Sequence, residues 1–511
     1  MRGAILFIIL TSFLILSGNQ AISQSGDIYH QGWIDFNKNG VKDKFEDPTL
    51  PVEARVNDLL SQMTVEEKTA QCATLYGYKR VLQDELPTET WKDEVWKDGI
   101  ANIDEHLNGL KPTPYSYPFS KHAEAINTVQ RWFVEQTRLG IPVDFTNEGI
   151  HGLNHDRATS LPAPIAIGST WDKKIVRQAG SIVGREAKAL GYTNIYAPIL
   201  DLARDPRWGR VVECYGEDPF LVTALGQQMV EGIQSQGVGS TLKHYAVYSV
   251  PKGARDGNAR TDPHVAPREM FQIYLYPYRE IIRESNPVGV MSSYNDWDGV
   301  PITASYYFLT TLLREQFGFK GYIVSDSEAV EFVYTKHHVA KDYKEAVLKV
   351  AEAGLNVRTQ FTPPQDYILP LRKLVEEKKL SMDVLDRNVA DVLRVKFRLG
   401  LFDNPYVEDT QAADSIVASP DTKEFMLKMA HESLVLLKNE NDLLPLQLDS
   451  ISNILVTGPL ATDETAYISR YGPQNIEVTS VLEGIQDYVG DSADIDYEKG
   501  CEVVDQTWPE S

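Results

Sequence analysis

The sequence alternates between stretches with helical periodicity and short apolar runs, and this alternation limits the possible folds more than any other feature. One predicted helix has apolar residues in steps of three and four from Ala123 to Phe133 and ends near Gly140. Another is capped by Asp172 and ends at Gly191. Such an alternation is typical of a parallel sheet whose strands are joined by crossover helices.

Five apolar runs are candidate strands, each separated from the next by enough chain for a loop, a helix and a second loop. They are centred near Phe145, Ala197, Leu242, Met291 and Val324. Further helices are expected over 220–234, 267–284, 344–353 and 382–398. Eight such units would close a TIM-like (β/α)8 barrel over residues 51–403. A doubly wound open sheet is the alternative, but no Gly-rich dinucleotide fingerprint follows any candidate strand.

The pattern changes after Phe402. A polar, acidic stretch within residues 404–430 is typical of a linker. The segment 431–511 then has the pattern of the start of a second α/β domain, with strands expected at Ser433–Leu437 and Ile454–Thr457 and a helix at Val481–Tyr488. We expect this second domain to be incomplete, because the segment offers no closing element.

The N-terminus has the pattern of a secretory signal peptide. Arg2 precedes an apolar run from Ala4 to Leu16, and small residues follow at Ala21 and Ser23. A membrane anchor is the alternative, but the run is shorter than the roughly 20 residues that span a bilayer. We therefore expect residues 1–23 to be cleaved and the protein to be exported to the periplasm or the extracellular space, without a membrane attachment.

The next segment, residues 24–50, contains a twelve-position calcium loop pattern. The pattern D-x-[DN]-x-[DN]-G-x5-E is filled without a mismatch, and Gly40 occupies the turn position. The candidate ligands are Asp35, Asn37, Asn39, Val41, Asp43 and Glu46. Because Pro48 and Pro51 follow immediately, a helix pair that switches on calcium binding is not expected. A structural calcium site is one interpretation, and a solvated Asn/Gly/Asp turn is the other.

Charge and cysteine content exclude several classes of protein. The formal net charge of −22 repels nucleic acid backbones and anionic lipid. Three scattered cysteines, Cys72, Cys214 and Cys501, are too few for a disulfide scaffold or a zinc cluster. We therefore expect neither nucleic acid nor a membrane as a partner.

Polar or ionisable residues follow every candidate strand. In a β/α barrel the active site forms at the carboxyl ends of the strands. The groups found there are Asn147-Glu148, Asp201 to Arg204, Lys243-His244, Ser292 to Asn295 and Ser325-Asp326. Solvated loop starts are the alternative explanation.

Asp326 is the sharpest of these candidates, because it ends an apolar strand that begins at Gly321. A buried strand presents such a carboxylate at a fixed place, where it can act as nucleophile or base. Lys243 and His244 could donate hydrogen bonds to hydroxyls, although a salt bridge and a core histidine are equally simple explanations. Arg210 lies in an Arg-Trp-Gly-Arg turn that could hold hydroxyl-rich ligands, or could anchor local carboxylates.

Six motifs occur in an order that resembles glycoside hydrolase family 3. They are Asn147-Glu-Gly-Ile-His151-Gly, Asp201 through Arg210, Glu217-Asp-Pro, Lys243-His244, Ser293-Tyr294-Asn295 and Ser325-Asp326-Ser. The resemblance implies a TIM-like barrel followed by an α/β sandwich domain. It also implies an exo-acting, retaining β-glycosidase that takes an oligosaccharide substrate and needs no cofactor for catalysis.

The resemblance assigns roles to individual residues. Asp326 takes the position of the nucleophile. Substrate-binding positions fall on Glu148, Arg210, Lys243, His244, Met291 and Tyr294, of which Met291 and Tyr294 could instead be packing residues. At the position of Glu148, glucose-specific members of the family often have Asp, whereas xylose-releasing members have Glu. The resemblance therefore favours terminal β-D-xylose over β-D-glucose.

A retaining glycosidase needs a second carboxyl group as acid/base. In the resembled family this group comes from the second domain, so we expect it to lie beyond Ser511. A degenerate homologue that binds sugar without cleaving it is a competing hypothesis. A metallohydrolase built on His151 and His155 is a weaker one, because no third ligand follows in a recognisable frame.

Overall fold

A computed structural model describes residues 28–504 except 110, 112, 251–261, 465–467 and 469. The predicted signal peptide lies outside these described residues. Across the described helices, none is both long enough and apolar enough to cross a bilayer.

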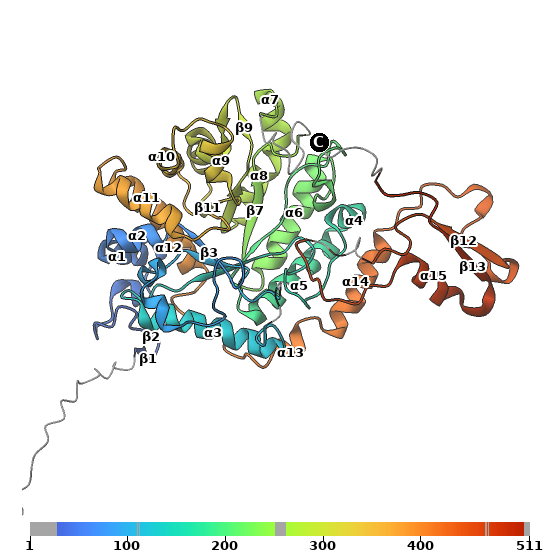
Figure 1. Ribbon diagram of the computed structural model, residues 1–511, viewed down its shortest axis with the longest axis horizontal. Coiled ribbons are helices and arrows are strands. Elements are labelled where there is room, and N and C mark those ends of the chain that lie inside the picture. Colours follow the sequence, from blue (N-terminus) through green and yellow to red (C-terminus); the bar gives the residue numbers. More distant parts are fainter. Residues whose placement is uncertain are drawn as a thin grey trace, which may run out of the picture.

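A curled, seven-stranded, all-parallel sheet forms the centre of the molecule (Figure 1). Its strands are β3 (Thr74–Tyr76), β4 (Asn102–Asp104), β5 (Asp144–Glu148), β6 (Asn194–Tyr196), β7 (Gly239–Tyr245), β8 (Gly289–Ser292) and β11 (Tyr322–Ser325). They are hydrogen bonded in the order β11-β8-β7-β6-β5-β4-β3, which is the reverse of their order in the chain. The five predicted strands are therefore present and parallel, and the TIM-like architecture is confirmed.

The two edge strands are joined through a short segment at Val357 and Arg358. Val357 forms a parallel bridge with Val324 of β11, and Arg358 forms one with Ala73, next to β3. The N–H of Thr74 donates to the Arg358 carbonyl at 2.9 Å. This short bridging segment thus takes the place of the eighth strand of the barrel. Because the strands are parallel, their carboxyl ends lie at one opening of the barrel.

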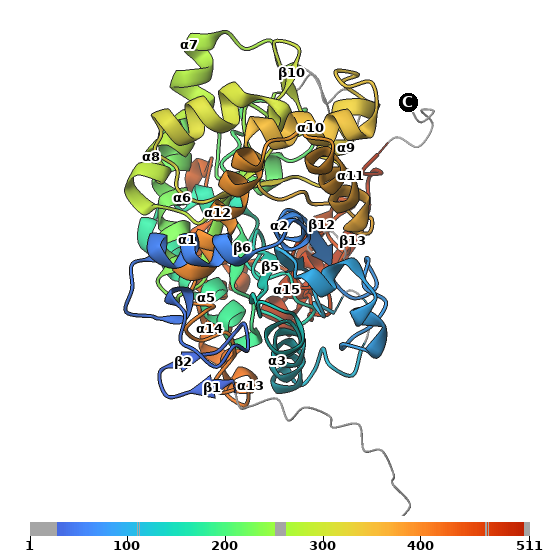
Figure 2. The same cartoon turned by 90° about the vertical axis from the view of Figure 1, so that its left-hand side faces the viewer.

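Helices cover the outside of the sheet. The main ones are α1 (Val52–Gln62), α2 (Val65–Ala70), α3 (Phe119–Gln136), α5 (Lys173–Leu190), α6 (Pro219–Gln234), α8 (Tyr276–Ser285), α9 (Ala329–Thr335), α10 (Tyr343–Ala353), α11 (Gln365–Glu376) and α12 (Met382–Arg398). In Figure 2 the labels of β5 and β6 lie at the centre with helices on several sides. Asp172 caps α5 by accepting from the N–H of Lys174, and Gly191 ends it with a φ of 93°.

The first and fifth crossovers depart from the expected regular units. Between β3 and β4 the chain forms only the 3-10 turns Glu89–Lys92 and Val95–Asp98. The helix expected over 267–284 is divided into α7 (Pro267–Glu269), a π-helical segment (Met270–Tyr274) and α8. Pro277 lies in the first turn of α8, where its missing N–H costs no hydrogen bond.

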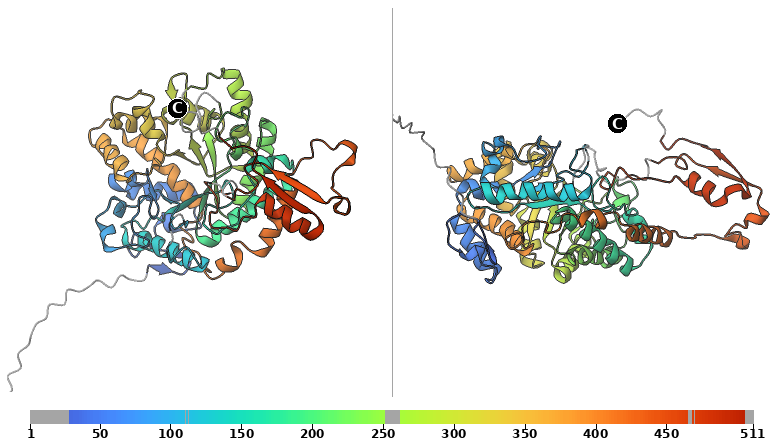
Figure 3. Two further views of the ribbon diagram at one scale, coloured as in Figure 1. Left: turned by 45° about the vertical axis from the view of Figure 1, so that its right-hand side comes forward. Right: turned by 90° about the horizontal axis from the view of Figure 1, so that it is seen from below.

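Residues after the barrel form two helices and a small α/β unit. Helix α13 (Ala413–Ile416) places Ala413 in the hydrophobic core, and α14 (Pro420–Glu432) places Phe425 and Met429 there. Beyond them, β12 (Asn453–Thr457) pairs in parallel with β13 (Asp494–Glu498), and α15 (Val481–Val489) connects them. This unit projects to one side of the barrel (Figure 3).

The strand expected at Ser433–Leu437 is wrong. These residues have no regular secondary structure, and Leu437 is 91% exposed. A strand forms only where a neighbour satisfies its N–H and carbonyl groups, and none pairs with this segment within the described part of the chain. An apolar pattern is thus not sufficient for a strand, because a strand also needs a paired neighbour, which this segment lacks among the described residues.

Candidate active site

Polar side chains from the strand ends meet around one cavity of about 160 Å³ at the mouth of the barrel. Its lining residues are Tyr76, Arg80, Glu105, Glu148, Tyr196, Arg210, Met291, Tyr294, Asp326, Ser327, Glu328, Phe361, Arg470 and Tyr471. Of the residues proposed from the sequence, Glu148, Arg210, Met291, Tyr294 and Asp326 line this cavity. Lys243 and His244 lie directly behind it, in contact with lining residues.

Asp326 presents one free carboxylate oxygen. Its Oδ1 accepts the N–H of Ser327 at 2.8 Å, and its own N–H donates to the Ser292 carbonyl at 3.1 Å. Oδ2 is buried and has no hydrogen-bond partner among the described residues. It lies 3.6 Å from Nε2 of His244. One oxygen therefore fixes the side chain, and the other remains available for a reaction.

Glu148, at the end of β5, is paired with Lys243 of β7. Nζ of Lys243 lies 2.5 Å from Oε2 of Glu148, and both side chains are buried. Burial raises the pKa of the Glu148 carboxyl, and the Lys243 ammonium opposes that shift. The pair offers a carboxylate acceptor and an ammonium donor side by side, which is the set that a sugar diol needs.

Arg210 and His244 form a buried chain with two carboxylates. Arg210 binds Glu213 through Nε at 2.9 Å and Nη2 at 2.6 Å, and its Nη1 lies 2.9 Å from Nε2 of His244. Because arginine only donates, Nε2 accepts here and Nδ1 carries the proton. That proton is donated to Oδ2 of Asp201 at 2.8 Å. Burial raises the pKa of Asp201 to about 7, and the Arg210 guanidinium opposes the shift.

The remaining predicted residues contribute apolar and aromatic walls. Met291, on β8, packs with Tyr196 and Val324 in the barrel interior. The ring of Tyr294 lies 5.7 Å from those of Tyr248 and Phe332. Both residues thus pack and line the cavity at once, so the two alternatives considered from the sequence do not exclude each other.

One part of the lining comes from outside the barrel. The ring of Tyr471, which precedes α15 in the chain, lies 5.8 Å from the Arg210 guanidinium and 5.5 Å from the Lys243 ammonium. Such distances are typical of cation–π contacts. The residue covers the cations of the cavity, and no sequence signal singled it out.

Sequence reasoning also missed the contribution of β3 and β4. These strands are only three residues long and carry the polar side chains Thr74, Asn102 and Asp104, so they show no apolar run. Their loops supply Arg80 and Glu105 to the cavity. The string Asp104 to His106 was the one available signal, because ionisable residues there follow Ile103 directly.

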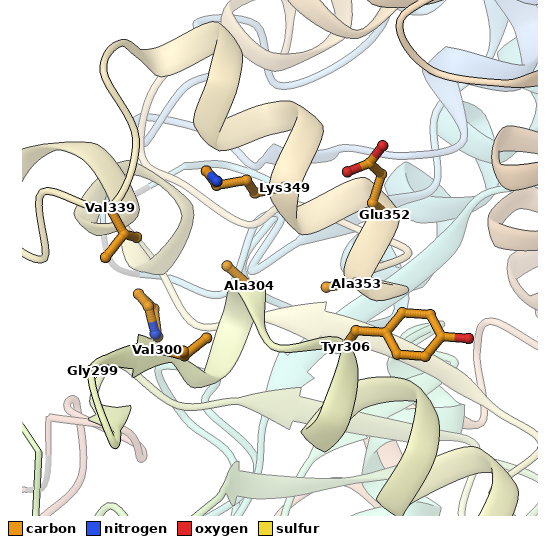
Figure 4. A pocket seen from close by; sticks show the side chains of 9 residues that line it. Gly299, Val300, Ala304, Tyr306, Val339, Lys349, Glu352 and Ala353 are labelled. Carbon is orange, nitrogen blue, oxygen red and sulfur yellow. The ribbon is translucent and has the colours of Figure 1, made fainter.

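A second cavity is larger, at about 400 Å³, but shares none of these groups. It lies between α10 and the hairpin of β9 (Asp296–Trp297) and β10 (Val300–Pro301). Figure 4 shows Lys349 and Glu352 on the helix, with Val300 and Ala304 facing them. Its walls are mainly apolar, so it lacks the convergent carboxylates of the smaller cavity.

The loop with the calcium pattern folds around its own carboxylates. Asp35 accepts the N–H groups of Asn39 at 3.1 Å and Gly40 at 2.8 Å. Oε1 of Glu46 accepts from Phe36, and its Oε2 accepts from Asp43. Burial raises the pKa of Glu46 to about 7. These hydrogen bonds would also be found in a solvated turn, and calcium binding at this loop stays a prediction.

Within the described residues, no three His, Cys, Asp or Glu side chains cluster as the ligands of a metal site made of such side chains alone, so a zinc-type centre is not found there. His151 borders a different cavity, and the ring of His155 lies edge to face against that of His122, with ring centroids 5.0 Å apart. The metallohydrolase hypothesis therefore gains no third ligand in this part of the chain.

Comparison with known proteins gives a consistent picture. Residues 64–395 match the family model described as the glycosyl hydrolase family 3 N terminal domain. A putative β-xylosidase of Formosa agariphila is 31% identical over 438 residues, which are 82% of this chain and 55% of that protein. A periplasmic β-glucosidase of Salmonella typhimurium is 31% identical over 475 residues, 90% of this chain and 58% of that protein.

Solved structures agree. A β-glucosidase from Erythrobacter marinus superposes with a TM-score of 0.81 and 31% identity, covering 90% of this chain and 60% of that one. A β-glucosidase from Listeria innocua in complex with glucose gives a TM-score of 0.74 and 29% identity, covering 89% and 61%. The chain thus spans a little over half the length of these relatives. By its family model and its fold, the chain belongs to glycosyl hydrolase family 3.

Proposed function

We propose that this protein is an exported, exo-acting, retaining β-glycosidase that releases terminal β-D-xylose or β-D-glucose from oligosaccharides. The observation that carries the proposal is the free Oδ2 of Asp326 at the wall of a cavity whose other walls supply hydroxyl-binding groups. A cavity of about 160 Å³ suits a single sugar ring, which supports release from a chain end.

The proposed reaction follows from the geometry. Oδ2 of Asp326 attacks the anomeric carbon, a bond forms between them, and the bond from that carbon to the leaving oxygen breaks with its electron pair going to that oxygen, which takes up a proton from an acid/base carboxyl or from solvent. Water then cleaves the ester between the sugar and Asp326, which releases the sugar and regenerates the carboxylate. Oδ1 stays bound to the N–H of Ser327, so the carboxylate keeps its orientation during the attack. Glu148 and Lys243 bind hydroxyls of the ring. Asp201 holds His244, and His244 in turn holds Arg210 beside the ring.

Glu148 is the residue expected to set the preference for the terminal sugar. The Glu148 side chain is one methylene longer than that of Asp and is held by Lys243, so we expect it to intrude on the space of a hydroxymethyl group and to favour xylosides. Relatives named β-xylosidase and β-glucosidase both occur among the similar proteins, which supports a mixed specificity. A panel of aryl β-xyloside, β-glucoside and α-arabinofuranoside substrates tests this, with Glu148→Asp expected to shift the preference toward the glucoside.

Covalent labelling tests the proposed nucleophile. A 2-deoxy-2-fluoro-β-glycosyl fluoride should label the peptide that contains Asp326, because fluoride leaves without protonation. Asp326→Ala should remove the label, whereas Asp205→Asn, a carboxyl outside the cavity lining, should retain it. Tight sugar binding without any label would instead favour the degenerate, binding-only homologue, and a label on another residue would refute the assignment of Asp326.

A further inference from the structure

The loop after β3 places Arg80 at the cavity with little freedom. The N–H of Arg80 donates to the Gly77 carbonyl at 3.1 Å, and the N–H of Leu82 donates to the Tyr76 carbonyl at 3.0 Å. A Cβ added at Gly77 would lie 2.3 Å from Cα of His106. The loop is therefore closed on itself and packed backbone to backbone against the loop after β4.

Two neighbours hold the Arg80 side chain. Its Nε donates to Oε2 of Glu105 at 3.1 Å, and its guanidinium lies 4.9 Å from the centroid of the Phe361 ring. The other oxygen of Glu105, Oε1, accepts from Nδ2 of Asn154 at 3.1 Å. Glu105 is 95% buried, so both ends of this small network are fixed by the protein.

This arrangement leaves the far side of the guanidinium available. Within the described residues, neither terminal nitrogen of Arg80 has a hydrogen-bond partner, and the side chain is 34% exposed. The residue lines the cavity that also contains Asp326 and Glu148. Up to four N–H groups are thus held in place at a sugar-sized cavity with no acceptor from the protein.

We propose that Arg80 is a specificity-determining residue that donates hydrogen bonds to hydroxyl oxygens of the bound sugar, and that Glu105 is its positioning residue. This inference rests on the proposed function. We expect the sugar to be neutral, because three cations at the cavity already face carboxylates of the protein: Arg80 faces Glu105, Arg210 faces Glu213 and Lys243 faces Glu148. An aromatic and an arginine side by side are well suited to a hydroxyl-bearing ring.

The test is a double-mutant cycle between the protein and the sugar. In the Asp326→Ala background, which prevents turnover, calorimetry would give the Kd of methyl β-D-xyloside, methyl β-D-glucoside and their monodeoxy analogues. Arg80→Met keeps the apolar length beside Phe361 but loses the donors. We expect it to weaken binding of the parent sugar about tenfold, as for a hydrogen bond to a charged group.

For the protein that retains Arg80, we expect the Kd of one deoxy analogue to be about tenfold higher than the Kd of its parent glycoside. For Arg80→Met, the Kd values of that analogue and of the parent should be equal. Arg80→Lys should restore part of the affinity, and Glu105→Gln should fall between. Arg157→Met is the matched control, since Arg157 lies 5.0 Å from the Tyr117 ring outside the cavity.

Three results would overturn the inference. Unchanged affinities in Arg80→Met and Arg80→Lys would remove the role of Arg80 while leaving the proposed function intact. A methyl β-D-glucuronide that binds more tightly than the glucoside would overturn the neutral sugar. Absence of any glycoside binding, together with absence of the Asp326 label in the unmodified protein, would overturn the proposed function and this inference with it.

Discussion

The barrel and the α/β unit at residues 453–498 both contain parallel strands, yet they differ in what surrounds those strands. All seven residues of β7 are buried, whereas β12 buries only Val456 and leaves Leu455 63% exposed. Figure 3 shows the cause: the barrel strands lie inside a layer of helices, and the smaller unit projects from it. A parallel ladder satisfies backbone groups, but only further layers remove apolar side chains from water.

The largest expected effect of that difference is on stability. Phe133→Ala, in the barrel core against Trp91 and Trp132, should lower the free energy of unfolding by about 3–5 kcal/mol. Leu437 lies in the exposed segment before the projecting unit, so Leu437→Ala should change the free energy of unfolding by less than about 0.5 kcal/mol. Urea unfolding followed by circular dichroism measures both. Equal losses would show that Leu437 is covered in solution.

The loop with the calcium pattern is attached to the barrel, because Nζ of Lys38 donates to the Val134 and Thr137 carbonyls at the end of α3. If the loop binds calcium, a free concentration one hundred times the Kd should stabilise the protein by about 2.7 kcal/mol. Removal of calcium by a chelator should then lower the Tm, and Glu46→Gln should abolish this sensitivity. Asp491→Asn, in the projecting unit, is the control. A chelator without effect would favour the solvated turn.

The pH dependence of labelling and of stability should distinguish the buried carboxyl of Asp201 from the more exposed carboxyl of Asp205. Asp201 has a pKa of about 7, so its anion holds His244 only above that pH, and the rate of Asp326 labelling should rise about tenfold as pH increases through 7. Stability should move the other way. Because the folded state binds the Asp201 proton more tightly than the unfolded state, its contribution to stability is complete below about pH 4 and is lost as pH rises through 7.

Asp201→Asn should remove both trends. Asp205→Asn should remove neither, because the Arg207 guanidinium lowers the pKa of Asp205 to about 2, far below this range. A labelling rate that is flat between pH 6 and 8 in the unmodified protein would contradict the role of Asp201.

The smallest predicted effect is at the contact between the two regions. Tyr471→Ala should raise the Kd of a methyl glycoside several-fold, because the ring covers Arg210 and Lys243, and a cation–π contact contributes about 0.5–1 kcal/mol at such sites. Tyr488→Ala, in α15 and 82% exposed, should leave the Kd unchanged. Equal effects of the two substitutions would indicate general destabilisation of the unit rather than a contact with the sugar.

Much of the barrel could be predicted because its elements carry local signals. Caps, glycine stops and apolar periodicity located α3, α5 and α12, and apolar runs located the five longer strands. Polar residues at the ends of those strands then identified Asp326 and Glu148 as neighbours in space, because parallel strands end at one opening. Strands β3 and β4 gave no such signal, since each has only three residues and the polar side chains of Thr74, Asn102 and Asp104 interrupt the apolar pattern.

The sequence by itself determined the class of fold, the family and the residues at the ends of the longer strands, because these depend on order along the chain. Only the tertiary structure decided which oxygen of Asp326 has no hydrogen-bond partner and that His244 accepts from Arg210. It also decided that Arg80 lines the cavity and is held there by Glu105. It also decided that Leu437 is exposed while Tyr471 lies over two cations. Hydrogen-bond partners and burial are set by residues distant in sequence, so no local pattern can report them.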